Sequence, residues 1–292
     1  MKVRPFVAVK LWQNSRFYLF GSAIGLAALH LILNWKIYGD LDQIIISVLF
    51  WGATLCLVWR KQDNLNLESD LISSFFGILL IGLVFYKSIS LFWFDISWLK
   101  ILPLLSVLGL GLVASGCKGL KQYWREMIIV LLLCLPTGLF TQIVDRLFHI
   151  STITTQFAVF LLWYVGFEVS RQATIIVLPN DYAQVAPACT GITTAFLLLK
   201  LSVIYILIFS TNWRQRILLV IGAISIAFLT SSIRVALIVT VISNRPAFDY
   251  WHSSPGNQIF STVAIFLFGF LCRYFHSSNE LSNQESRKLN ES

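Results

Sequence analysis

The chain has 292 residues, of which 57% are hydrophobic and only 12% are charged. This balance excludes an ordinary soluble domain, in which about 25% of the residues are charged. The net charge of +8 would favour nucleic acid as a partner of a soluble protein. Here the basic residues cluster at the ends of apolar runs, which is typical of membrane topology signals. We therefore expect an all-α, multi-pass membrane protein surrounded by lipids, with no nucleic-acid partner.

Several apolar runs reach the roughly 18 to 20 residues that a helix needs to cross a bilayer. A basic N-terminus precedes the first run, as in a signal peptide, but the many later runs favour an uncleaved first helix. Most of the 22 Lys and Arg residues are cytoplasmic if both ends of the chain lie inside, which agrees with the positive-inside rule. About eight spans are predicted: Phe17–Leu33, Ile44–Trp59, Leu71–Phe94, Ile101–Ser115, Met127–Val144, Ile192–Phe209, Ile217–Ile242 and Gln258–Tyr274.

The segment Ser151–Val169, between the fifth and sixth predicted spans, is also long enough to cross. A ninth crossing would place Arg214 and Arg216 outside, against the positive-inside rule. We therefore predict an amphipathic helix that lies on the outer surface. Its expected wet face holds Thr152, Thr154, Thr155 and Gln156, and its expected apolar face holds Phe157, Phe160, Leu161 and Tyr164.

Two β-rich runs follow, Ala173–Leu178 and Tyr182–Val185, with a Pro-Asn-Asp turn between them. They predict a short β-hairpin outside the membrane. The whole chain is predicted to be one integral membrane domain in four parts. These parts are five N-terminal spans (1–144), an extracytoplasmic interfacial helix and hairpin (145–188), a three-span core (189–275) and a disordered cytoplasmic tail (276–292).

Cys189 is the one cysteine predicted to lie at the outer face, where the hairpin meets the next apolar run. In the first turn of a helix, unpaired N–H groups and the positive end of the dipole favour thiolate over thiol. The alternative is a small apolar side chain that fills a gap between helices. The five cysteines include no C-x-x-C pair, so we expect neither a disulfide framework nor a metal site, and no cofactor.

Arg234 and His252 are predicted to converge on the same face as Cys189. Arg234 interrupts an apolar span roughly two turns below its outer end, where a charge needs a partner or a task, although an arginine can also snorkel to the headgroups. His252 falls in the last outer loop, where a histidine can simply be solvated. Together the three supply a nucleophile, a proton shuttle and a fixed cation, the parts that acyl transfer needs. Asp249 could orient the imidazole, but a solvated aspartate is the simpler reading.

Three short motifs occur in order in the last part of the chain. They are A-C-T-G-I at 188–192, S-S-I-R-V at 231–235 and H-S-S-P-G at 252–256. Their order resembles the exosortase/archaeosortase family, whose pattern is A-C-S-G-[IL], N-x-x-R-[VIL] and H-x-x-x-G, and within it the chain looks like a cyanobacterial exosortase. The sequence departs from the pattern at Thr190 and at Ser231, and the second departure removes an amide that could hold Arg234.

The resemblance implies a membrane-embedded cysteine protease and transpeptidase in the cytoplasmic (inner) membrane, with its site on the periplasmic face. Its substrates would be exported proteins that end in a PEP-CTERM-like tail: a short motif, a transmembrane helix and a basic segment. Cleavage would give a thioacyl enzyme, resolved by an unidentified acceptor such as a lipid- or polysaccharide-linked group. By motif, the catalytic residues would be Cys189, Arg234 and His252, and the substrate-binding residues Thr190, Gly191 and Gly256.

Two other classes of function compete with this reading. In a transporter or a carrier of lipid-linked glycans, Arg234 and Lys200 would be counter-charges for the substrate in a membrane cavity. The sequence lacks paired Gly- or Pro-broken helices in two matching halves, which disfavours a transporter. A purely structural assembly partner would tolerate the loss of Cys189, Arg234 and His252.

Overall fold

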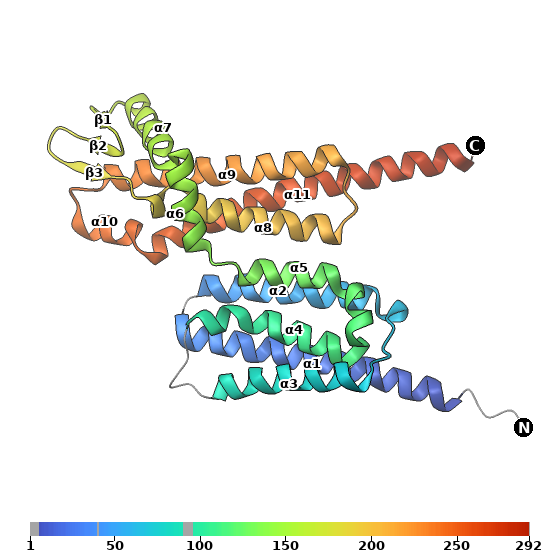
Figure 1. Ribbon diagram of the computed structural model, residues 1–292. Coiled ribbons are helices and arrows are strands. Elements are labelled where there is room, and N and C mark those ends of the chain that lie inside the picture. The colour runs from blue at the N-terminus through green and yellow to red at the C-terminus, as the bar shows by residue number, and fades with distance from the viewer. Residues whose placement is uncertain (1–5, 40, 90–95, 292) are drawn as a thin grey trace, which may run out of the picture. The chain divides into compact units, whose positions relative to one another are not determined.

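The computed structural model describes residues 6–39, 41–89 and 96–291 (Figure 1). The basic residues Lys2 and Arg4 and the end of the predicted span Leu71–Phe94 lie outside these ranges. The chain forms two compact units, Met1–Leu135 and Pro136–Ser292. Within each unit most residues are helical, as the sequence predicts.

The first unit is a bundle in which α4 packs against α1, α3 and α5, and α2 packs against α1 and α5. Its apolar core is built mainly from leucines of α1 and α4, among them Leu26, Leu33, Leu99 and Leu102. The helices are α1 (Phe6–Tyr38), α2 (Leu41–Arg60), α3 (Leu71–Ile89), α4 (Ile96–Gly119) and α5 (Trp124–Cys134), with 3-10 turns at Gln62–Asn64 and Leu120–Tyr123.

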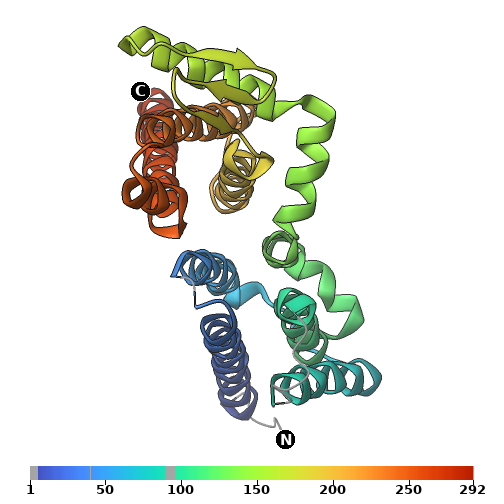
Figure 2. The same cartoon turned by 90° about the vertical axis from the view of Figure 1, so that its left-hand side faces the viewer.

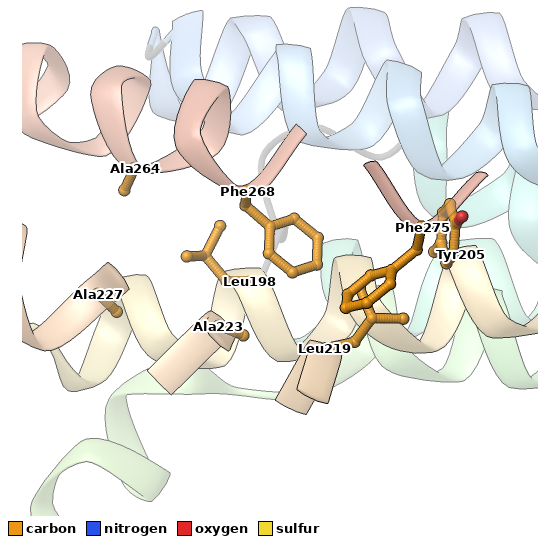
Figure 3. Close-up of a cluster of buried hydrophobic side chains, with 8 residues drawn as sticks. All are labelled: Leu198, Tyr205, Leu219, Ala223, Ala227, Ala264, Phe268 and Phe275. Carbon is orange, nitrogen blue, oxygen red and sulfur yellow. The ribbon is translucent and has the colours of Figure 1, made fainter. Parts of the chain in front are cut away.

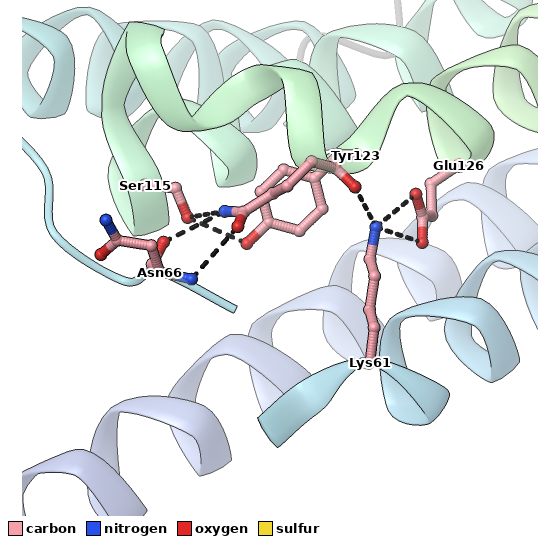
Figure 4. A network of polar contacts seen from close by, with 6 residues as sticks. Lys61, Asn66, Ser115, Tyr123 and Glu126 are labelled. Carbon is pink, nitrogen blue, oxygen red and sulfur yellow. Dashed lines mark hydrogen bonds and ion pairs between the residues drawn. The ribbon is translucent and has the colours of Figure 1, made fainter. Parts of the chain in front are cut away.

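A polar network lies at one end of this bundle, where α2 and α5 meet (Figure 4). The ammonium of Lys61 lies 2.8 Å from each carboxylate oxygen of Glu126, and it also donates to the backbone carbonyl of Gln122. Glu126 is 1% exposed, so its charge is neutralised inside the protein. Further hydrogen bonds of 2.6 to 3.1 Å join the side chains of Ser115, Gln122 and Tyr123 to one another and to the backbone of Asn66.

In the second unit, α8, α9 and α11 pack against one another. Their shared core holds Leu198, Leu219 and Phe268, together with alanines of α9 that let the helices approach closely (Figure 3). The helices are α6 (Thr137–Phe148), α7 (Ile150–Val165), α8 (Ile192–Ile208), α9 (Trp213–Thr240), α10 (Arg245–His252) and α11 (Ser254–Glu291). The strands are β1 (Ser170–Gln172), β2 (Ile175–Val177) and β3 (Tyr182–Gln184).

The three strands form one antiparallel sheet in the order β1-β2-β3, at the end of the unit where α9 finishes (Figure 2). Ile176 and Val185 pack with α7 and α9 in a second apolar cluster. The predicted hairpin is confirmed as β2 and β3. The sequence does not indicate β1, because its three residues are polar and exposed. A two-residue connection leads from β1 to β2, with Ala173 at a φ of 52°.

The helix predicted within Ser151–Val169 is present as α7, but its predicted wet face is wrong in part. Thr154 and Thr155 are fully buried in the protein. They tolerate burial because their hydroxyls find backbone acceptors: Thr155 Oγ1 donates to the Ser151 carbonyl at 2.6 Å. The aromatic residues Phe160 and Tyr164 lie on the outward face, which would contact lipid in a membrane.

The fifth predicted span, Met127–Val144, is not one helix. α5 ends at Cys134, Leu135 is extended and α6 begins at Thr137. Pro136 lacks a backbone N–H and disfavours a helical residue before it, so the helix cannot continue through this point. Within the described residues, six helical stretches are long and apolar enough to cross a membrane, or seven if α6 and α7, bent by 72°, form one broken span. α8 is a shorter apolar helix, and the count agrees roughly with the eight spans predicted.

The tail from residue 276, predicted to be disordered, continues α11 to Glu291. It contains neither glycine nor proline, so nothing in the sequence terminates the helix that enters it.

Candidate active site

Cys189 is held in a short 3-10 turn between the sheet and α8. The turn covers Pro187–Cys189, and the Cys189 N–H donates to the Ala186 carbonyl at 2.9 Å. Cys189 therefore lies just before α8, which begins at Ile192 as the sequence predicts, and not within the first turn of that helix. The thiol is half-buried and packs against the cluster formed by the sheet, α7 and α9.

Gly191 is required by the way this turn meets α9. Its φ of 78° lies in the left-handed region, which side chains disfavour. A Cβ at this position would lie 2.8 Å from the Ala227 carbonyl oxygen and would overlap Ser231. The turn that carries the thiol therefore lies directly on α9, one turn before Arg234, and the small side chain at Ser231 leaves room for it.

Thr190 anchors the same turn from the other side. It is 1% exposed, and its hydroxyl donates to the Pro187 carbonyl at 2.7 Å. Its own carbonyl accepts a hydrogen bond of 3.5 Å from Thr154 on α7. The structure thus gives Thr190 and Gly191 packing roles, and their predicted contacts with a substrate stay predictions.

His252 is the last residue of α10 and is exposed. Its ring stacks on Phe248, one helical turn earlier, with centroids 5.2 Å apart and planes inclined by 12°. Among the contacts described for this part of the chain, none joins the Asp249 carboxylate to the imidazole. Phe248 thus orients the ring, which is the role that the sequence analysis considered for Asp249.

A cavity of about 170 Å³ brings Cys189 and His252 to one site. Its lining comes from strand β3 and the segment after it, from the C-terminal part of α9 and from α10. Most of its lining is apolar and comes from Val185, Val235, Ile238, Val239, Ile242 and Phe248.

Arg234 lies on α9, next in the chain to Val235, which lines this cavity, and it is 8% exposed. Its Nη1 donates to Asn257 Oδ1 at 2.9 Å, and its Nη2 donates to the backbone carbonyls of His252 at 3.2 Å and Trp251 at 3.5 Å. The guanidinium also interacts electrostatically with Cys189. Its Nε–H is buried, and within the described part of the chain it has no hydrogen-bond partner.

Gly256 closes the corner between α10 and α11. A Cβ there would lie 2.6 Å from the backbone of Trp251 and 2.7 Å from the Tyr250 carbonyl oxygen. Only glycine lets the first turn of α11 approach the end of α10 so closely. Gly256 therefore helps to place His252, and the proposed substrate contact at this position is untested.

The remaining predicted residues lie elsewhere. Lys200 is half-buried on α8 and is not part of the cavity lining described above. Three functional neighbours were missed by sequence reasoning: Thr154, Phe248 and Asn257. Phe248 stands four residues before His252, a helical spacing that could have suggested the stack. Asn257 directly follows the third motif and could have been noted as a polar residue at the start of an apolar span.

The comparisons with known proteins give one match. The family model described as transmembrane exosortase (Exosortase_EpsH) matches residues 35–269, which include all three motifs and most of both units. No curated protein and no solved structure matches the chain.

Proposed function

The chain belongs to the transmembrane exosortase family, and on this premise we propose that it is a membrane-embedded cysteine peptidase and transpeptidase with Cys189 as its nucleophile. Membership suggests sortase-like processing of proteins at a membrane. The observation that carries the finer proposal is the shared cavity of Cys189 and His252, with the buried cation of Arg234 bound to the His252 carbonyl.

In the proposed reaction, the Cys189 thiolate attacks the carbonyl carbon of the scissile peptide bond. The C–N bond then breaks, the leaving amine takes a proton from His252, and the acyl group remains on sulfur as a thioester. An acceptor amine, hydroxyl or water next attacks the thioester and gives its proton to His252, and the thiolate leaves. Each cycle restores both residues, so no redox partner is needed.

Arg234 suits the role of the fixed cation that stabilises negative charge, because it cannot lose its proton. Two of its nitrogens hold the α10–α11 corner and so position His252. Within the described residues its Nε–H is buried without a hydrogen-bond partner, and in the proposed mechanism this N–H would donate to the anionic oxygen that forms when the thiolate attacks. In a carrier, by contrast, the guanidinium would have to meet a substrate, and here its Nη atoms are occupied by Asn257 and the backbone.

The substrates we propose are exported proteins with a C-terminal motif, a transmembrane helix and a basic tail. We place the enzyme in the cytoplasmic (inner) membrane with the cavity on its outer face. The protein is multi-pass, and a thiol near the end of a membrane helix suits a cleavage point just outside the bilayer.

The test uses a reporter whose C-terminal tail comes from an exported protein of the same host. Cys189→Ala should leave the full-length reporter uncleaved in the membrane, while Cys56→Ala and Cys117→Ala, which remove exposed thiols, should process it normally. Membrane abundance of each variant controls for folding. Normal cleavage by Cys189→Ala would refute the thiol mechanism.

A further inference from the structure

Strand β3 has an open edge. Leu178 N–H donates to the Asp181 carbonyl and Val185 N–H to the Thr174 carbonyl, each at 2.9 Å. Because hydrogen-bonded pairs alternate along an antiparallel ladder, the backbone groups of Tyr182 and Gln184 point away from β2. The Tyr182 N–H is taken by the Asp181 carboxylate at 2.9 Å. Within the described residues no further strand pairs with this edge, so it presents the Tyr182 carbonyl and both backbone groups of Gln184.

This edge borders the cavity that contains the thiol. Tyr182, Ala183 and Gln184 line it on one side, and Phe248 and His252 line it on another. The chain runs from β3 through Val185 directly into the turn that holds Cys189. A peptide lying along the edge of β3 would therefore lie beside the cavity that contains the thiol.

The cavity is lined mainly by apolar side chains and is of limited size. Val185, Ile238 and Ile242 are among its lining residues, and its volume is about 170 Å³. An apolar cavity of about 150 Å³ holds one benzene-sized group. A charged side chain would lose its hydration there without gaining a partner.

We propose that an extended segment of the substrate adds to the open edge of β3 as a fourth strand, and that one apolar side chain beside its scissile bond fills this cavity. The proposal rests on the peptidase function proposed above and names the form in which the substrate is bound. Strand addition obtains affinity from main-chain hydrogen bonds and specificity from a pocket for an alternate side chain. The enzyme would thus read the backbone of its target along β3 and a single side chain beside Cys189.

The first experiment measures how fast peptide vinyl sulfones label Cys189 in the full-length protein in membrane vesicles. The thiolate adds to the alkene and the resulting carbanion takes a proton from solvent, so labelling needs no turnover. Four probes differ only in the residue next to the warhead: Gly, Leu, Phe or Asp. Mass spectrometry of the Cys189 peptide gives the rate, and iodoacetamide reports the intrinsic reactivity of the thiol.

We expect the Leu probe to react at least about tenfold faster than the Gly and Asp probes. Equal rates for the four probes would overturn the side-chain part of the proposal.

The second experiment removes the backbone donor on the open edge. Gln184→Pro should slow the Leu probe about tenfold and leave the iodoacetamide rate unchanged, because proline has no N–H. The matched control is Arg171→Pro, on the open edge of β1, which faces away from β2 by the same alternation and lies outside the cavity lining. It should leave both rates unchanged. Undiminished labelling of Gln184→Pro by the Leu probe would overturn strand addition.

A third measurement needs no variant and so stands even if Gln184→Pro misfolds. Leu probes methylated at one backbone nitrogen at a time should lose reactivity at every second position, since only alternate residues of an added strand face β3. A flat or irregular profile would overturn the proposal. Failure of strand addition can be told apart from failure of the proposed function. If the protein is a thiol peptidase that binds its target in another way, the Cys189→Ala variant will still leave the reporter uncleaved, although the probe experiments give the contrary result.

Discussion

Each of the two units buries a charged residue, and the partners of the two buried charges differ. In the first unit, Glu126 meets an opposite charge, since Lys61 lies 2.8 Å from both of its oxygens. In the second unit, the described contacts of Arg234 are an amide oxygen and two backbone carbonyls, with no carboxylate among them. One charge is cancelled inside the protein, and the other keeps its full positive value beside a thiol.

A buried charge is costly in a membrane protein unless it is paired or used. The Lys61–Glu126 pair joins α2 to α5, so a structural role accounts for its burial. Arg234 is held by neutral acceptors that orient it without neutralising it, which is the arrangement expected of a group that stabilises a developing anion. The comparison therefore predicts that the first pair governs stability and that Arg234 governs rate.

The largest effect should follow from Arg234→Lys. Lysine keeps the charge but cannot reach Asn257 and the His252 carbonyl while also offering a third donor. Loss of one donor to an oxyanion typically costs about 100- to 1000-fold in rate, and we expect a loss of that size in reporter processing. Membrane abundance should stay normal. Near wild-type processing by this variant would show that Arg234 is only an anchor, and the comparison would fail.

Gly191→Ala should come next, with a loss of about 100-fold, because misplacing a reacting group by about 1 Å can cost that much. The added Cβ would displace the thiol-bearing turn from Ser231 and Ala227. The matched control is Gly166→Ala at the end of α7, where φ is 100° but nothing lies within 4 Å of the new Cβ. It should show the backbone penalty alone, seen as a lower melting temperature with processing intact. Equal activity of the two variants would count against a site built on close approach to α9.

Glu126→Gln tests the other side of the comparison. It leaves the Lys61 ammonium without its carboxylate and should destabilise the protein by about 1–3 kcal/mol, the usual cost of an unsatisfied buried group. Thermal unfolding in detergent measures this change. Processing per folded molecule should stay within about twofold of wild type, and the double variant Lys61→Met/Glu126→Gln should recover part of the lost stability. A reduced rate with unchanged stability would mean that the first unit takes part in the chemistry.

The smallest effect is expected for Phe248→Leu. An aromatic stack contributes about 0.5–1.5 kcal/mol, so losing the stack on His252 should slow processing by up to about tenfold. Phe248→Tyr keeps the stacked face and should restore the rate. Failure of tyrosine to rescue would show that Phe248 acts through the shape of the cavity instead of through the imidazole.

The sequence predicts much of this fold because membrane helices are specified locally, by the length and apolarity of each run. Prediction from the sequence fails where a single residue or a distant contact determines the local structure. Pro136 divides a run that composition alone makes continuous, and Thr154 is buried where its hydroxyl meets the carbonyl of Thr190, 36 residues later in the chain.

The candidate site shows the same limit. The motifs predict which residues matter, and the structure brings two of them, Cys189 and His252, to one cavity. They do not indicate that the glycines serve close packing, that Phe248 orients the imidazole or that Asn257 holds Arg234. These roles depend on how α9 meets the turns before and after it, and such contacts join residues that are far apart in the chain.

The position of α9 between the two reactive residues has a consequence for the order of synthesis. Cys189 is made first, its support on α9 follows, and His252 and Asn257 come last, close to the C-terminal helix. A growing chain that has already inserted its thiol therefore has no imidazole and no fixed guanidinium beside it. On the proposed mechanism, a chain without α11 would lack part of the site, so an unfinished or truncated chain would not cleave its neighbours in the membrane.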